Sequence, residues 1–154
     1  MAYKSQPTVT RPANTTPYTA GDVVGGAIPL VGLPNSALVQ DLYITSADLR
    51  VDVSAVPSGM TSFRFHLYNA TPPSAIADNA AWDLPSGDRA SYLGYVDVGS
   101  PADAGATLYS QVDQVNKHIR PGPAGVWAYM VTNGGFTPAG NSEVYAPCIQ
   151  AIAL

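Results

Sequence analysis

The chain has 154 residues, of which 46% are hydrophobic and 12% are charged, and its formal net charge is −4. This length corresponds to one average domain, and the charge is too low for a chain that stays disordered through charge repulsion. Only two Lys and one Glu are present, so the usual residues of exposed helix faces are scarce, which argues against a mainly helical protein. The five Arg are scattered over positions 11, 50, 64, 89 and 120, which leaves no basic stripe for a nucleic-acid partner.

The single cysteine and the apolar segments bear on the cellular compartment in which the chain folds and on whether it crosses a membrane. Cys148 has no second cysteine to pair with, so folding in a reducing cytoplasm is expected. The chain does not begin with a charged and then apolar leader, and the longest apolar stretches, such as Val23–Val31, are too short to cross a membrane. We therefore expect no membrane partner.

The first 20 residues are predicted to form an extended arm, followed by one domain over residues 21–154. Pro7, Pro12 and Pro17 are spaced five residues apart, and each proline disfavours helix in the residue before it. One interpretation is a frayed terminus. The other is an arm that docks on a neighbouring subunit through apolar anchors, which would be Tyr3, Val9 and Tyr18.

The next part of the chain has the alternation that is typical of strands. Strands are predicted over Val23–Val31 and Leu38–Thr45. A hairpin is then predicted, because Leu49–Val53 and Phe63–Leu67 alternate apolar and polar residues on either side of a turn at Pro57–Gly59. In that hairpin Asp52 would lie opposite Arg64, and Arg50 opposite His66.

The middle of the chain holds the one predicted helical turn, Ser74–Trp82, with Ser74 as its cap. Further strands are predicted over Tyr92–Val98, Thr107–Val115 and Val144–Leu154. Gly125–Thr132 is apolar on both faces, which predicts a strand that is buried on both sides, within the domain or at a subunit contact. About eight short strands predict an all-β fold, a β-sandwich with jelly-roll connections as one option.

The sequence offers little that could support catalysis. His66 and His118 are interpreted as surface residues, and Cys148 as a small buried hydrophobic residue. Zinc would need closely spaced Cys or His, which the chain lacks. The aspartates of the middle segment are interpreted as caps and turn stabilisers rather than calcium ligands, and they are Asp78, Asp83 and Asp88. We expect no catalytic, metal or cofactor site.

Nine Tyr and two Trp leave two interpretations open. They could form a face that stacks on sugars or binds a protein. Alternatively, they pack inside the sandwich with their polar atoms at the rim. Few charges and a two-sided apolar strand also fit an interface between subunits.

Several segments resemble small structural proteins of tailed bacteriophages. The resemblance lies in Thr10–Gly25, in Leu67–Pro73, in Ala77–Trp82, and in Trp127–Val131 before Thr137-Pro138. Pro17 stands where a less restrictive residue is expected in this group. The resemblance implies a virion component, a β-sandwich protein that decorates and cements the capsid, and it brings no catalytic residue.

The function expected from the sequence is therefore adhesive. The protein would be made in the cytoplasm of the host bacterium and would bind the major capsid protein and copies of itself, as a homo-oligomer such as a trimer, on the capsid surface. The residues expected at protein interfaces are Val9, Arg11, Pro12, Tyr18, Trp127 and Tyr129. One alternative is a tail or fibre protein, or a host-adsorption module that binds glycans. Another is a cell-wall glycan hydrolase, with its candidate residues His66, Asp78 and Glu143.

Overall fold

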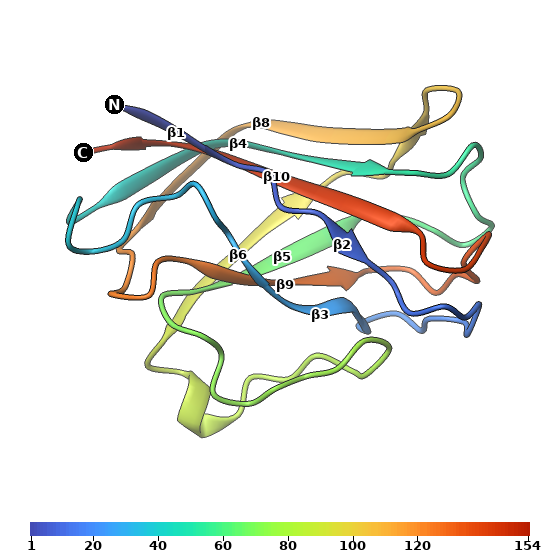
Figure 1. The fold of residues 1–154 in the computed structure, drawn as a ribbon, viewed down its shortest axis with the longest axis horizontal. Coiled ribbons are helices and arrows are strands. Elements are labelled where there is room, and N and C mark those ends of the chain that lie inside the picture. Colours follow the sequence, from blue (N-terminus) through green and yellow to red (C-terminus); the bar gives the residue numbers. More distant parts are fainter.

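The computed structural model describes all 154 residues and contains two antiparallel sheets that pack face to face (Figure 1). The first sheet has the order β1-β10-β4-β8-β7, and β2 also pairs with β10. Its strands are β1 (Ala2–Ser5), β2 (Val9–Thr10), β4 (Leu42–Val51), β7 (Ala102–Asp103), β8 (Leu108–Ile119) and β10 (Val144–Ala153). The second sheet has the order β3-β9-β5-β6, with β3 (Val23–Pro29), β9 (Trp127–Thr132), β5 (Phe63–Tyr68) and β6 (Tyr92–Val98).

The order of the strands is that of a jelly roll. The chain crosses between the sheets at six of its nine connections, and only β1–β2, β5–β6 and β7–β8 connect strands of the same sheet. The resulting double-sheet arrangement of two Greek keys is the jelly-roll architecture. The predicted all-β sandwich is thus confirmed. None of its helices has the length and hydropathy that a membrane span requires.

The N-terminal segment contains the short strands β1 and β2, and it lies within the sandwich. In the β1–β10 pair Tyr3 lies opposite Ala151, and in the β2–β10 pair Val9 lies opposite Tyr145. The chain then passes to the second sheet, where Tyr18 forms a bridge with Phe136. Residues 1–20 therefore supply an edge of the first sheet and a link between the two sheets.

The predicted hairpin is wrong, because its two strands lie in opposite sheets. β4 belongs to the first sheet and β5 to the second, and residues 52–62 cross between them with Met60 buried in the core. The strand partner of Arg64 is Asp97 on β6 instead of Asp52. Alternation locates β5 correctly, but it divides β4 into two predicted strands, Leu38–Thr45 and Leu49–Val53, and it carries no information on which strands pair.

The predicted helical turn over Ser74–Trp82 is also absent. This part of the chain runs without helix across the outer face of the second sheet, and the one helical turn is a 3-10 turn over Ser86–Asp88. Asn79 has φ of 62°, which ends any helix, and the backbone N–H of Ile76 donates to the Tyr129 hydroxyl. Contacts with the sheet thus override the helix propensity of its alanines.

The core lies between the sheets and contains 26 buried hydrophobic residues. A second, smaller cluster lies between the outer face of the second sheet and residues 69–91, and it contains Val23, Tyr68, Tyr129 and Val131. β9 is therefore buried on both faces within the domain, in accord with its two-sided apolar pattern. Full burial of one large apolar side chain contributes about 1.5–3 kcal/mol, so both clusters stabilise the fold.

Candidate interaction site

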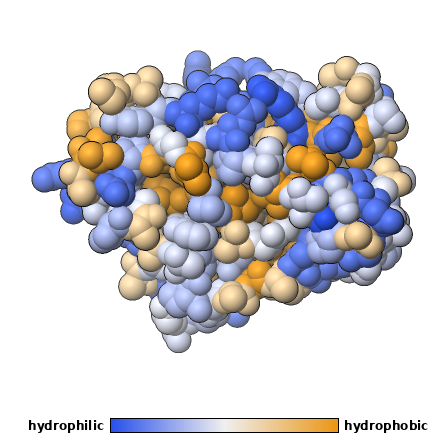
Figure 2. Space-filling view, in the orientation of Figure 1, coloured by the Kyte–Doolittle hydropathy of each residue, from blue (hydrophilic) through white to orange (hydrophobic).

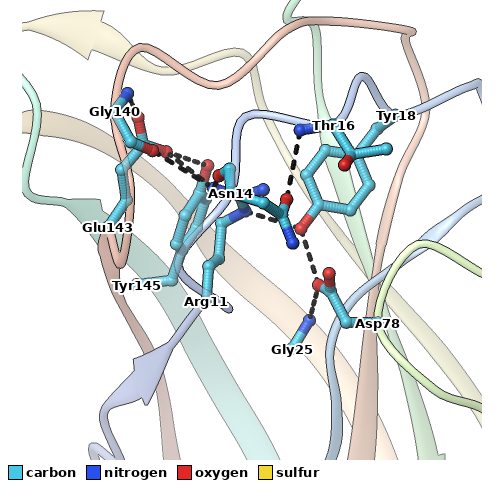
Figure 3. Close-up of polar contacts among 9 residues, drawn as sticks. All are labelled: Arg11, Asn14, Thr16, Tyr18, Gly25, Asp78, Gly140, Glu143 and Tyr145. Carbon is cyan, nitrogen blue, oxygen red and sulfur yellow. Dashed lines mark hydrogen bonds and ion pairs between the residues drawn. The ribbon is translucent and has the colours of Figure 1, made fainter.

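A buried polar network holds the N-terminal segment against the rest of the sandwich (Figure 3). The side chain of Arg11 is fully buried, and its Nε donates to the Tyr18 hydroxyl at 2.6 Å. The Tyr18 hydroxyl donates in turn to Oδ1 of Asp78 at 2.6 Å, and the backbone N–H of Gly25 donates to the same oxygen at 2.8 Å. Burial, together with the hydrogen bond to Asp78, raises the pKa of Tyr18.

The other side of the Arg11 guanidinium faces Glu143. Their nearest atoms, Nη1 and Oε2, are 3.8 Å apart, and both side chains are buried. The Tyr145 hydroxyl donates to Oε2 of Glu143 at 3.3 Å, and the backbone N–H of Gly140 donates to Oε1 at 2.8 Å. Nη2 of Arg11 is buried without a hydrogen-bond partner. The network therefore ties the N-terminal segment, the segment around Asp78 and the loop before β10 to one buried cation.

The three residues of the hydrolase hypothesis are not brought together as a group. Asp78 and Glu143 are both bonded within the Arg11 network. His66 lies on the outer face of the second sheet, where its ring stacks on Trp82 with centroids 3.6 Å apart, and its Nδ1 is 2.8 Å from the Tyr92 hydroxyl. Burial, with a smaller contribution from the charge of Arg64, lowers the pKa of His66 to about 4. The imidazole is therefore neutral near pH 7.

The interpretation of His66 as a surface residue is wrong, because Trp82, which belongs to residues 69–91 (the covering segment), leaves His66 only 4% exposed. His118 is on the surface as predicted, with Nε2 3.2 Å from Asp41. Cys148 is fully buried as predicted, and burial raises the pKa of its thiol to about 11.

Of the three aspartates interpreted as caps and turn stabilisers, Asp83 bonds locally, whereas Asp78 and Asp88 bond to distant segments. Asp88 accepts from both the backbone N–H and the hydroxyl of Ser74, and Asp83 accepts from the backbone N–H of Leu84. No three side chains among the His, Cys, Asp and Glu of the chain gather in a way that could hold a metal ion.

The residues expected at protein interfaces lie mostly inside their own chain. Val9, Arg11, Tyr18 and Tyr129 are buried. Trp127 is half-buried and Pro12 is exposed. The Tyr129 hydroxyl, for example, donates to the Ser74 carbonyl at 2.8 Å, so residues of the same chain already cover it. Contact between these residues and a neighbouring subunit stays a prediction, and it requires the N-terminal segment or the covering segment to move.

An exposed apolar surface lies instead at the end of the sandwich that carries both termini (Figures 1 and 2). We call it the apolar end, and its exposed large apolar residues are Met1, Val31, Leu38, Ile152 and Leu154. Val31 and Leu38, which are 71% and 74% exposed, line one hollow of about 240 Å³.

Backbone contacts bring the parts of the apolar end together. The Met1 carbonyl accepts from the N–H of Ala153, and the N–H of Leu154 donates to the Asp41 carbonyl. Gly32 packs against the Lys4 carbonyl so closely that a Cβ would not fit there. The Arg120 guanidinium borders this end, with Nε 3.3 Å from Asp41, and Nε2 of His118 lies 3.2 Å from the same carboxylate.

Sequence reasoning missed the apolar end. Val31 and Leu38 had been assigned to the ends of two predicted strands, whereas both lie in the loop between β3 and β4. Apolar residues beside a proline and a glycine give the same local pattern in a strand and in an exposed loop. Only the position of the loop in the fold distinguishes the two.

Comparison with known proteins assigns no family to the chain. Neither a family model nor a curated protein matches it. Similar solved structures include the capsid of Ralstonia phage GP4, with a TM-score of 0.43 and 13% identity over 100% of this chain and 84% of the other. The cyanophage Pam1 capsid asymmetric unit has a TM-score of 0.33 and 14% identity over 100% and 84%. A bacterial lipoprotein from Bacteroides thetaiotaomicron also matches, with a TM-score of 0.43 and 8% identity over 99% and 84%.

Proposed function

We propose that this protein is a virion structural protein of a tailed bacteriophage that decorates the capsid and stabilises its shell. The observation that carries the proposal is the apolar end, where five large apolar side chains are left uncovered by their own chain. Exposed apolar surface of this kind marks a site of protein contact. The resemblance of four sequence segments to small phage structural proteins supports the choice of a virion partner.

The partner is the major capsid protein, and the protein binds it as a homo-oligomer. Burial of one large apolar side chain contributes about 1.5–3 kcal/mol, whereas association costs at least about 4 kcal/mol. A single copy that buries two or three such side chains therefore binds weakly. Linked copies bind more tightly, because the second contact becomes intramolecular.

Stabilisation of the shell follows from selective binding. A protein that binds the assembled shell but not its separated subunits shifts the equilibrium toward the shell. On the capsid surface the cation beside the apolar end, Arg120, would lie at the rim of the contact. Rim charges affect the rate of association more than its free energy.

The test is co-sedimentation with phage shells assembled without this protein. A variant with both Val31→Asp and Leu38→Asp places two charges on the apolar end and is expected to lower the affinity for shells at least tenfold. Val56→Asp is the matched control, because Val56 is also exposed but lies in the connection after β4, at the opposite end of the sandwich. Equal binding by all three proteins would contradict the proposal.

A tail or host-adsorption role is the second candidate. It is favoured by two stacked planar side chains on the outer face of the second sheet, Tyr95 and Arg64. Tyr95 is 47% exposed, and the Arg64 guanidinium lies 3.8 Å from the centre of the Tyr95 ring. Such surfaces stack on sugars. Immunolabelling of intact particles separates the two roles, since label confined to the tail would exclude decoration. Glycan binding that is lost on Tyr95→Ala would favour the adsorption role.

A further inference from the structure

The two sheets end on the same side of the sandwich with unpaired strands. β6 pairs only with β5, and β7 pairs with β8 only at Leu108 and Tyr109, so residues 110–119 of β8 have no partner on their outer side. β6 and β8 border one groove of about 500 Å³. Unpaired strands of this length can pair with a strand from another molecule. We call β6 and residues 110–119 the open side.

A bulge interrupts β8 in the middle of the open side. Asp113 pairs with Ser46 and Lys117 with Ile44, so the single residue Thr45 of β4 faces three residues of β8. Within the bulge Gln114 and Asn116 have φ of 59° and 54°, which residues other than glycine seldom adopt. A bulge of this kind bends and twists its strand and re-aims the side chains that follow.

The bulge turns Lys117 toward the space between the sheets. Before it, the even-numbered residues Leu108 and Ser110 are buried, and after it the odd-numbered Ile119 is buried. Lys117 therefore points inward beside the fully buried Ile44. Its Nζ lies 2.6 Å from the position that a Cβ would take on Gly94 of β6, so the glycine leaves room for the ammonium.

The ammonium of Lys117 forms no ion pair within the chain. None of the ion pairs in the structure includes Lys117, so no carboxylate oxygen lies within 4.0 Å of its Nζ. The side chain is half-buried and lines the groove, which is open to solvent. A strand that covered the groove would exclude this solvent and bury an unpaired charge, which proteins avoid.

We propose that Lys117, placed by the bulge, prevents a second copy of this chain from adding a strand to the open side. An inward-pointing charge and a bulge are two devices that keep sheet edges from pairing. Contacts between copies are thereby directed to other surfaces. This inference does not depend on the identity of the shell partner.

The test compares two lysine variants by sedimentation velocity over a range of concentrations. Lys117→Met keeps the length of the side chain and removes the charge, and it is expected to strengthen self-association at least tenfold. Lys4→Met is the matched control, because Lys4 is exposed on β1 and its loss changes the net charge equally. Hydrogen exchange should show slower exchange for the amides of β6 and β8 in the associated form.

A third variant distinguishes the effect of a charge inside the groove from the effect of a change in the net charge of the protein. Lys117→Glu keeps a charge in the groove and is expected to associate as weakly as the native chain. Unchanged association of Lys117→Met, or equally increased association of Lys4→Met or Lys117→Glu, would overturn the proposal. If thermal unfolding shows that Lys117→Met does not fold, Lys117→Val is measured instead, and it too is expected to self-associate at least tenfold more strongly than the native chain.

Discussion

The Arg11 Nε and the Tyr18 hydroxyl are 2.6 Å apart in the interior, and this bond links two parts of the N-terminal segment that belong to different sheets. Arg11 follows β2, which pairs with β10 of the first sheet, whereas Tyr18 bridges to Phe136 beside the second sheet. The guanidinium also faces the carboxylate of Glu143. Loss of either charge would leave the other buried and unpaired.

Arg11→Met is therefore expected to lower the free energy of unfolding by about 3–5 kcal/mol, the usual cost of breaking a buried ion pair from one side. Urea denaturation measures this change. Arg120→Met is the control, because Arg120 is exposed beside the partly exposed Asp41, and its loss should cost less than about 1 kcal/mol. Adding Glu143→Gln to Arg11→Met should recover part of the loss, and a further loss in the double variant would contradict the pairing.

His66 predicts a pH dependence of stability. Burial lowers its pKa from 6.5 to about 4 in the folded chain, so between these values the unfolded chain binds a proton that the folded chain does not. Stability from this residue is complete above pH 6.5 and falls as the pH drops toward 4, by about 3 kcal/mol in all. Denaturation from pH 7.5 to 4 measures the loss.

The matched variant for this titration is His66→Phe, which keeps a planar ring against Trp82. It is expected to have a shallower dependence on pH than the native chain in this window, whatever its stability at pH 7.5. The same slope in both proteins would show that other groups cause it.

Cys148 should react slowly with alkylating reagents in the folded protein. Its side chain is fully buried, and burial together with the nearby Asp48 raises the pKa of the thiol to about 11, so little thiolate is present at pH 8. We expect labelling by iodoacetamide to be more than about 100-fold slower in buffer than in denaturant. Mass spectrometry follows the reaction, and rapid labelling of the native chain would show that β10 opens readily.

A pair of cysteines tests whether the N-terminal segment stays on its own chain. Ala2 and Ile152 lie opposite each other in the β1–β10 pair, and both are exposed. The variant with Ala2→Cys and Ile152→Cys is expected to form a disulfide within one chain, seen as a monomer on a non-reducing gel. A cross-linked dimer would show that the segment is exchanged between copies, and then Val9, Arg11 and Tyr18 would lie at a subunit interface.

The elements that could be predicted are those with a local signal. Alternation located β5 and β6 within a residue, because one face of each is buried. The strand partner of Arg64 could not be predicted, because from sequence alone Arg64 could pair with Asp52 or with Asp97. The choice depends on residues 52–62, which carry the chain from the first sheet to the second and so place Asp97 beside Arg64. The same limit applies to Lys117, whose inward direction depends on a bulge that the pairing with β4 defines.

The placement of β10 affects how the chain folds during synthesis. β10 separates β1 and β2 from β4, so the first sheet stays in two parts until β10 has left the ribosome. The pairs it completes join the opposite ends of the sequence, and such distant contacts form slowly. A polypeptide that stops before Val144 would expose the flanks of both parts, so truncated products are expected to be substrates for chaperones and proteases.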